Sequence, residues 1–182
     1  MRLILFAVAA AIVVGLLAGG TLREFPSVRL QHAWLALGGV VLQFVPVGGT
    51  IGNVLLYASF AVLLLFAALN LRAPGFTLIL VGLALNALVI VANTGMPVTR
   101  HALVASNQSA TLADLVAKGG SKHHLAGEGT ILLPLADVMA VGSPIDQAIS
   151  IGDVCVQLGA VWFIVFSMPR RHPRLPQPET AG

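Results

Sequence analysis

Residues 76–92 read FTLILVGLALNALVIVA and contain no charged side chain. A helix needs about 20 mostly apolar residues to cross the hydrocarbon core of a bilayer, and this stretch comes close to that length. The composition of the whole chain agrees with it. Hydrophobic residues make up 57% of the 182 residues and charged residues only 9%, whereas an ordinary soluble domain carries roughly a quarter charged residues. The sequence therefore excludes a soluble enzyme and predicts an integral membrane protein.

Four further apolar stretches accompany this one, near residues 3–20, 33–47, 51–71 and 151–168. Together they predict an all-α fold, with about five transmembrane helices forming a single domain over residues 1–168. The first stretch also has features of a secretory signal, because Arg2 precedes an apolar core that ends in Ala18-Gly19-Gly20. The same small residues suit close contact between helices, and we expect this stretch to be a retained span.

Basic residues predict the side of the membrane on which each connection lies. Residues 21–32, 70–74 and 169–182 hold six of the ten Lys and Arg residues, and short connections rich in Lys and Arg stay in the cytoplasm. We therefore expect a bacterial plasma membrane protein with its N-terminus outside and its C-terminus inside. The long connection 94–150 would be extracytoplasmic and carry short helices. The proline-rich basic tail 169–182 is predicted to be disordered and to lie near anionic headgroups.

Three capping-box patterns predict helix starts in or just after the long connection. They are Thr111-x-x-Asp114, Ser143-x-x-Asp146 and Ser150-x-x-Asp153, the last of which opens the final span. The apolar run 131–141 is interrupted by Pro134 and Asp137 and is too short to cross. We expect it to be re-entrant or to pack against the end of the bundle.

Amide side chains occur at membrane depth, where polar groups are costly. Asn86 and Asn93 share one face of the fourth span, and Gln43, Asn53 and Gln157 lie on other spans. One interpretation is that these amides hold helices together through hydrogen bonds. The other is that they line a functional site. Asn93-Thr94-Gly95-Met96-Pro97 has the same two interpretations: it ends the fourth helix, or it presents Asn93 and the backbone at Gly95 to a ligand.

Asp137 and Asp153 form the sharpest candidate pair. Both fall at the predicted outer end of the bundle, one inside an apolar run and one just before the fully apolar part of the last span. If their carboxyl groups met, repulsion and partial desolvation would raise one pKa and leave a shared proton. One carboxylate would then activate water while the other donates to a scissile carbonyl oxygen. The structural alternative is that Asp153 caps its helix and Asp137 pairs with Arg100 or Lys122.

The remaining candidate groups point to binding. Arg100, Lys122 and His123 would complete a polar site with Asn93 and the two aspartates. His123, His124 and Glu128 lack the further spaced His or Cys of a tetrahedral metal set, so we predict neither a metal site nor a cofactor. The single cysteine excludes an intramolecular disulfide. No run of basic residues lies beside stacking aromatics, so nucleic acid is not an expected partner.

The chain carries a series of motifs in a set order. They are Gly19-Gly20 followed by arginines, Gln43, Asn93-x-Gly95-x-Pro97-Val98, Lys122-His123, Asp137 and Ser150-Ile151-Gly152-Asp153. In these motifs the chain resembles an uncharacterised family of bacterial integral membrane proteins, domain-of-unknown-function family 5317, over most of its length up to about Met168. The resemblance implies the layout of the spans and no activity.

A fainter similarity is to lipoprotein signal peptidase, a membrane aspartic protease. The Asn-x-Gly motif and the two aspartates of that family are similar to Asn93-Thr94-Gly95, Asp137 and Ile151-Gly152-Asp153. The similarity implies that Asp137 and Asp153 are the catalytic pair and that Asn93 positions the substrate. The chain departs from that family in having five predicted spans instead of four, and Ser150 where the family has an asparagine.

The sequence thus supports two hypotheses from different classes. In the first, the outer connection folds onto the bundle and forms a polar site that binds a lipid-linked group, a peptide group or a partner protein, with membrane lipid around the spans. In the second, the protein is a membrane aspartyl hydrolase that uses Asp137 and Asp153. A transporter is disfavoured because no span is broken at its middle by Gly or Pro.

Overall fold

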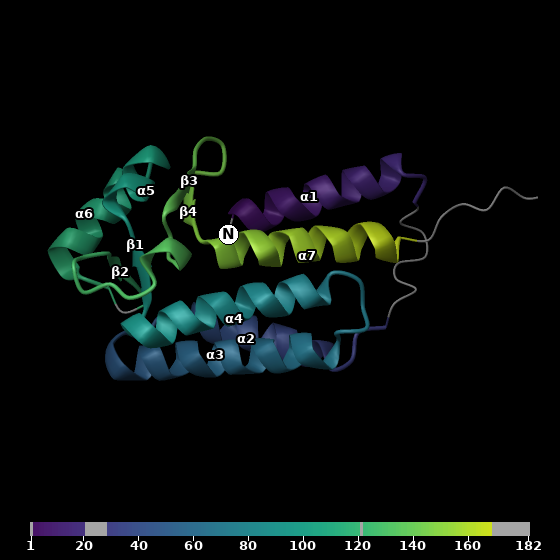
Figure 1. The fold of residues 1–182 in the computed structure, drawn as a ribbon, viewed down its shortest axis with the longest axis horizontal. Coiled ribbons are helices and arrows are strands. Elements are labelled where there is room, and N and C mark those ends of the chain that lie inside the picture. Colours follow the sequence, from purple (N-terminus) through teal and green to yellow (C-terminus); the bar gives the residue numbers. More distant parts are fainter. Residues whose placement is uncertain (1, 21–28, 121, 169–182) are drawn as a thin grey trace, which may run out of the picture.

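The computed structural model describes residues 2–20, 29–120 and 122–168. Five long helices run along the long axis of the molecule (Figure 1): α1 (Arg2–Leu17), α2 (Ala33–Phe44), α3 (Gly49–Leu69), α4 (Phe76–Asn93) and α7 (Ile151–Ser167). They coincide with the five predicted apolar stretches to within a few residues. By length and composition, α3 and α4 suffice to cross a membrane, and the other three are shorter apolar helices. The mostly helical fold is confirmed, whereas the five-span arrangement stays a prediction.

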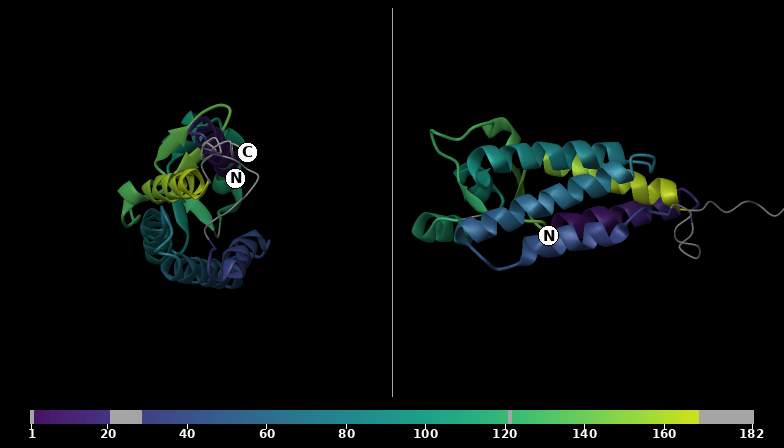
Figure 2. Two further views of the ribbon diagram at one scale, coloured as in Figure 1. Left: turned by 90° about the vertical axis from the view of Figure 1, so that its right-hand side faces the viewer. Right: turned by 90° about the horizontal axis from the view of Figure 1, so that it is seen from below.

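The five helices lie side by side in the order α1, α7, α4, α3, α2 and form an arc when viewed end-on (Figure 2). Many large apolar side chains on their outer surfaces are exposed, among them Leu17, Trp34, Leu37 and Ile51. Soluble monomers rarely expose apolar patches this extensive. The surface therefore agrees with the apolar composition of the chain.

Glycines bring α4 and α7 into the closest contact of the bundle. A Cβ atom on Gly82 would collide with the carbonyl oxygen of Gly152, and Gly75 and Gly159 approach each other in the same way. Small residues at such crossings let helix backbones approach closely, which is how apolar helices associate in lipid. This contact places the first half of α4 against the first half of α7.

Residues 94–150, called the cap segment below, fold over one end of the helices (Figure 1). The segment contains β1 (Met96–Val98), α5 (Arg100–Ala105), α6 (Ser109–Lys118), β2 (His123–Leu125), the 3-10 helix η1 (Leu133–Leu135), β3 (Met139–Val141) and β4 (Gln147–Ile149). Strand β1 pairs in parallel with β2, and β3 pairs antiparallel with β4. Short helices were expected here, whereas the strands were not.

Two of the three predicted capping boxes are wrong. Helix α6 begins at Ser109, two residues before Thr111, because Asn107 adopts a positive φ that ends α5 and allows the next helix to start at once. Residues 143–146 start no helix; they form the turn between β3 and β4, whose ladder pairs Val141 with Gln147. The third box, Ser150 with Asp153 at the start of α7, is confirmed.

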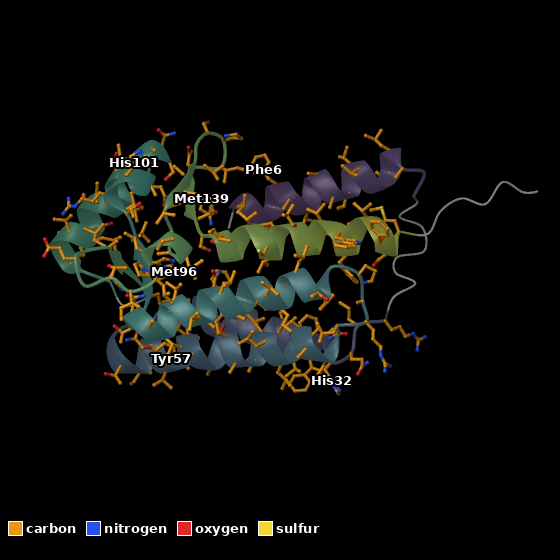
Figure 3. All side chains as sticks on the ribbon, viewed as in Figure 1. Phe6, His32, Tyr57, Met96, His101 and Met139 are labelled. Carbon is orange, nitrogen blue, oxygen red and sulfur yellow. The ribbon has the colours of Figure 1, made fainter. Side chains whose placement is uncertain are left out.

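A buried apolar cluster joins the cap segment to the helices. Met96 and Ala136 from the cap pack with Leu56 of α3 and with Val89 and Ile90 of α4. Figure 3 shows Met96 at this junction. The run 131–141 therefore contacts the bundle through Ala136. A second cluster, formed by Val98, Ala102, Leu103 and Ala148, makes a separate core inside the cap.

Candidate functional site

The backbone of Asp137 is fixed beside β1. Its amide donates to the carbonyl oxygen of Pro97 at 3.0 Å, and its own carbonyl oxygen accepts from the amide of Thr99 at 3.2 Å. These bonds make an isolated bridge between Val98 and Asp137, so that β1 lies between β2 and Asp137. The ladder thus holds the Asp137 side chain at the junction of the cap and the helices, where only 8% of it is exposed.

The two carboxyl oxygens of Asp137 have different surroundings. Oδ2 lies 3.9 Å from Nε2 of His123, a contact longer than a hydrogen bond, and Oδ1 is buried without any hydrogen-bond partner. Burial raises the pKa of Asp137 to about 8, and the negative charge of Asp153 adds to the rise. The Asp137 carboxyl is therefore mostly protonated at about pH 7.

Asp153 lies in contrasting surroundings, because both of its carboxyl oxygens accept hydrogen bonds. Oδ1 accepts from Nδ2 of Asn86 at 2.8 Å, and Oδ2 accepts from the amide of Ser150 at 3.1 Å. The hydroxyl of Ser150 accepts from the amide of Asp153 and donates to Oδ1 of Asn86. These donors suit a carboxylate anion.

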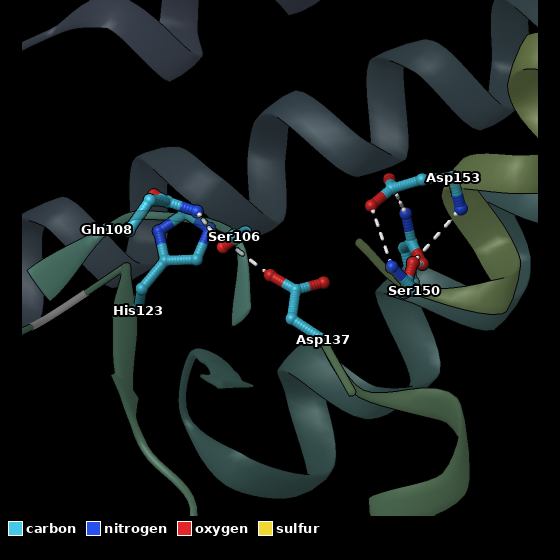
Figure 4. Close-up of polar contacts among 7 residues, drawn as sticks. Ser106, Gln108, His123, Asp137, Ser150 and Asp153 are labelled. Atoms are coloured by element: carbon cyan, nitrogen blue, oxygen red, sulfur yellow. Dashed lines mark hydrogen bonds and ion pairs between the residues drawn. The ribbon is translucent and has the colours of Figure 1, made fainter. Parts of the chain in front are cut away.

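The two aspartates thus form an unequal pair at the start of α7. In Figure 4 the unpartnered oxygen of Asp137 points away from His123, toward the side of the site that holds Ser150 and Asp153. The two carboxyl groups are close enough for the charge of Asp153 to act on Asp137. Within the described residues no hydrogen bond joins them directly. The arrangement places a neutral acid within electrostatic reach of a hydrogen-bonded carboxylate.

His123 forms the open side of the site. Desolvation by the surrounding chain lowers the pKa of His123 below 6.5, the charge of Asp153 opposes this, and the charges of His124 and Lys122 add to it. The imidazole is therefore mostly neutral at about pH 7. Its side chain is nevertheless 59% exposed, so it remains in contact with solvent.

Neither basic residue proposed as a partner of Asp137 takes that role. The ammonium group of Lys122 donates to the carbonyl oxygens of Gln43 and Val45, at 2.7 and 2.8 Å. It thereby holds the end of α2 to the cap. Arg100 is exposed in the first turn of α5. The structural alternative in which Asp137 pairs with Arg100 or Lys122 is therefore wrong, because within the described residues neither cation forms an ion pair with Asp137.

Asn93 anchors the cap segment to α4. Its Nδ2 donates to the carbonyl oxygens of Val89 and Ile131, and its Oδ1 accepts from the amide of Ile131 at 2.8 Å. Thr94 and Gly95 adopt positive φ and end α4, and the Gly95 amide closes the last turn on Ile90. The motif Asn93-Thr94-Gly95 therefore ends α4, as the first of its two interpretations predicts.

A second polar feature lies on the same end of the molecule. An open hollow of about 740 Å³ is lined by Gly48, Gly49, Asn53, Asn93, Thr94, Lys118, Gly119, Gly120 and His124. The aspartates do not line it, and His123 and His124 lie on opposite faces of β2, as successive strand residues do. The hollow and the aspartate pair are therefore separate features on the two sides of this strand.

Comparison with known proteins identifies the family of this chain. Residues 27–165 match a family described as a family of unknown function, DUF5317. The chain belongs to this family. No curated protein and no solved structure matches the chain. The similarity to lipoprotein signal peptidase is therefore not supported, whereas the resemblance to the uncharacterised family is confirmed.

Sequence reasoning missed part of the polar framework of this DUF5317 protein. Asn70, only 4% exposed, binds the backbone of Gln31 through both its oxygen and its nitrogen at the end opposite the cap. The hollow was also missed, because three segments far apart in the sequence build it. An amide in the last turn of an apolar helix was the available signal for Asn70, and Asn93 shows the same pattern.

Proposed function

We propose that this DUF5317 protein is a multi-pass protein of the bacterial plasma membrane whose cap segment lies outside and holds a polar binding site around Asp137. Two apolar helices of spanning length and the exposed apolar surface support a membrane location. Arg29, shortly before α2, and Arg72, between α3 and α4, are exposed. The connection between α3 and α4 lies at the end opposite the cap (Figure 1), which supports a cytoplasmic position for that end. The N-terminus and the cap would then both be extracytoplasmic.

The unpartnered oxygen of Asp137 carries the binding proposal. A buried polar atom without a partner costs about 1–3 kcal/mol, and the great majority of such atoms in native proteins are hydrogen-bonded. Only 8% of the Asp137 side chain is exposed, yet neither Arg100 nor Lys122 reaches it. A group that supplied the missing hydrogen bond would remove this cost. We propose that this group belongs to a lipid-linked or peptide ligand or to a partner protein.

Co-purification tests the proposal. The wild-type protein, Asp137→Leu and the exposed control Asp114→Asn are purified in mild detergent and analysed by native mass spectrometry. The wild type and the control should retain a stoichiometric lipid, peptide or protein, and Asp137→Leu should lose it. A wild-type protein that emerges as a bare monomer would count against a binding role.

A second candidate function, an aspartyl hydrolase, is favoured by the pKa of about 8 for Asp137 beside the hydrogen-bonded Asp153. Asp153 would accept a proton from water while Asp137 donates its proton to the scissile carbonyl oxygen. The hydrolase is the second candidate because both oxygens of Asp153 already accept hydrogen bonds within the protein. Asp137→Asn and Asp153→Asn should each abolish turnover at unchanged protein abundance. Normal processing by either variant would exclude this mechanism.

A further inference from the structure

An apolar groove lies between α1 and α4, in the half of the bundle away from the cap segment. Helices α1 and α4 both pack on α7, which lies between them (Figure 1). The groove has a volume of about 360 Å³, and every described residue that lines it is apolar. Its walls include Val8 and Ile12 of α1, Phe76 and Ile79 of α4, and Phe163 and Ile164 of α7.

The size and lining of the groove suit a hydrocarbon chain. A buried water molecule needs two to four polar partners, and the side chains that line the groove offer none. An unfilled gap would forfeit the dispersion contacts of its walls. The 360 Å³ of the groove equals the share of about twelve water molecules at about 30 Å³ each. An α-helix with its side chains is about 10–12 Å across, so this volume holds less than one turn of a partner helix.

A buried hydrogen-bonded bridge brings two arginines together at the end of the bundle opposite the cap. The side chain of Asn70, in the connection that follows α3, accepts from the amide of Gln31 at 2.7 Å and donates to its carbonyl oxygen at 3.0 Å. This bridge ties the segment before α2 to the connection between α3 and α4. Arg29 and Arg72 each lie two residues from the bridge, and both are exposed.

The chain neighbours of these arginines connect them to the groove. Leu30, which follows Arg29, lines the groove. Ala73, which follows Arg72, packs with Leu30 in the apolar cluster around Phe76. The positive charge is not offset, because every acidic side chain in residues 2–20, 29–120 and 122–168 lies in the cap segment or in the first turn of α7.

We propose that the groove and the two arginines bind one anionic phospholipid, with an acyl chain in the groove and the headgroup phosphate at Arg29 and Arg72. The inference rests on the membrane location proposed above and is independent of the site at Asp137. Arginine pairs with phosphate through two parallel hydrogen bonds. Basic residues near a membrane surface also favour anionic lipids. Chain and headgroup together distinguish this site from the lipid that surrounds any apolar helix.

Lipid titrations of the full-length protein in detergent, followed by native mass spectrometry, test the proposal. The probes are dioleoyl phosphatidylglycerol, which is anionic, and dioleoyl phosphatidylcholine, which has the same chains and no net charge. The wild type should bind one phosphatidylglycerol saturably and about tenfold more tightly than phosphatidylcholine, since each basic residue near a headgroup contributes about fivefold. Equal affinities for the two lipids, or the absence of saturable binding, would overturn the proposal.

Charge variants test the position of the headgroup. Arg29→Gln and Arg72→Gln should each lower the affinity for phosphatidylglycerol about fivefold, and the double variant should lose the preference over phosphatidylcholine. Arg100→Gln is the matched control, because it removes an exposed arginine from the cap, and it should change neither affinity. A preference that survives in the double variant would overturn the assignment of the headgroup to this end.

Groove variants test the position of the chain. Ala160→Leu narrows the groove from α7 and Val8→Phe narrows it from α1. Each should lower the affinity for both lipids about tenfold, because an overfilled groove no longer admits the chain. Ala9→Leu adds a side chain on the exposed side of α1 and should leave both affinities unchanged. Thermal unfolding checks that the variants fold, and full affinity in folded Ala160→Leu and Val8→Phe would overturn the proposal.

The same spectra separate this inference from the other proposals. A dimer without lipid would show that a second copy of the chain fills the groove, and it would overturn the inference. A protein in the membrane fraction that binds no phosphatidylglycerol would keep its membrane location and lose this site. Phosphatidylglycerol binding that depends on Arg29, Arg72 and the groove, without any ligand that depends on Asp137, would support this site and contradict the one at Asp137.

Discussion

The side-chain amide of Asn86 donates to Oδ1 of Asp153 over 2.8 Å, beside the contact of Gly82 on α4 with Gly152 on α7. Ser150 completes the arrangement by donating to Oδ1 of Asn86. Asn86 is 6% exposed and Ser150 is fully buried, so water is poorly placed to replace either bond. These three side chains therefore fix the start of α7 against α4.

Replacing Asn86 by leucine should destabilise the protein. The change removes a donor to a carboxylate and the acceptor of a buried hydroxyl, and hydrogen bonds to charged groups contribute about 1.5–3 kcal/mol each. We expect the free energy of unfolding in detergent to fall by roughly 2–4 kcal/mol. Asn53→Leu is the matched control, because Oδ1 of Asn53 is buried without a partner, and it should be neutral or stabilising. Equal losses in the two variants would contradict the assigned role of Asn86.

The glycine contact between α4 and α7 predicts a sharp difference between two alanine substitutions. A methyl group at Gly82 meets the carbonyl oxygen of Gly152, whereas a methyl group at Gly38 on α2 meets nothing within 4 Å. Gly82→Ala should lower the thermal stability by an amount equivalent to about 1–3 kcal/mol. Gly38→Ala should be neutral or raise it, since alanine favours helix by about 1 kcal/mol over glycine. A tolerated Gly82→Ala would show that the helices are farther apart.

Removing the Asn93 side chain should loosen the cap segment locally. Asn93→Ala leaves the amide and the carbonyl group of Ile131 without their partners on α4. We expect the Ile131 amide to exchange hydrogen faster by about tenfold, which corresponds to the loss of one hydrogen bond. Asn107→Gly removes an exposed hydrogen bond to Asp146 and should leave exchange at Ile131 unchanged. Unaltered exchange in Asn93→Ala would argue against anchoring by this side chain.

Membrane sidedness can be measured with single cysteines on a Cys155→Ser background. Glu128 in the cap and Leu71 beyond the end of α3 are both exposed, and replacing them alters no basic residue. Glu128→Cys should react with an impermeant maleimide on intact cells, and Leu71→Cys only after permeabilisation, because the basic connections stay inside. The reverse pattern would place the cap in the cytoplasm and invalidate the proposed orientation.

The long helices could be predicted from the sequence, whereas the fold of the cap could not. Apolar stretches of near-spanning length and the Ser150–Asp153 capping box are local signals. The cap strands are three residues long, and their pairing joins Met96 to His123 far along the chain. Strand pairing also explains why the predicted capping box at Ser143 and Asp146 is wrong. Their capping pattern is local, but the β3–β4 ladder around them determines the backbone.

The acidic residues of the candidate site could be predicted from the sequence, whereas the groups that surround them could not. Asp137 and Asp153 stand out as carboxyl groups inside or beside apolar runs. No local pattern shows that Lys122 is directed to the end of α2, which leaves Asp137 without a cation. The amide of Asn86 was a candidate for joining helices, and its contact with Asp153 confirms that role.

The unequal aspartate pair also predicts how stability depends on pH. The pKa of Asp137 is about 8 in the folded protein against an ordinary 3.8, so the folded protein holds this proton more tightly than the unfolded chain. Its contribution to stability is complete below about pH 4 and declines as the pH rises to about 8, by about 1.4 kcal/mol per pH unit at most. Asp137→Asn should not show this decline, whereas Asp114→Asn should retain it.

Infrared titration of the Asp137 carboxyl group, with its band assigned by its absence in Asp137→Asn, measures whether this side chain is a buried neutral acid. We expect a protonated-acid band that persists through neutral pH and disappears with a midpoint near pH 8. A midpoint near the ordinary 3.8 would mean that Asp137 is solvated or paired with a cation, and it would contradict a buried neutral acid at this site.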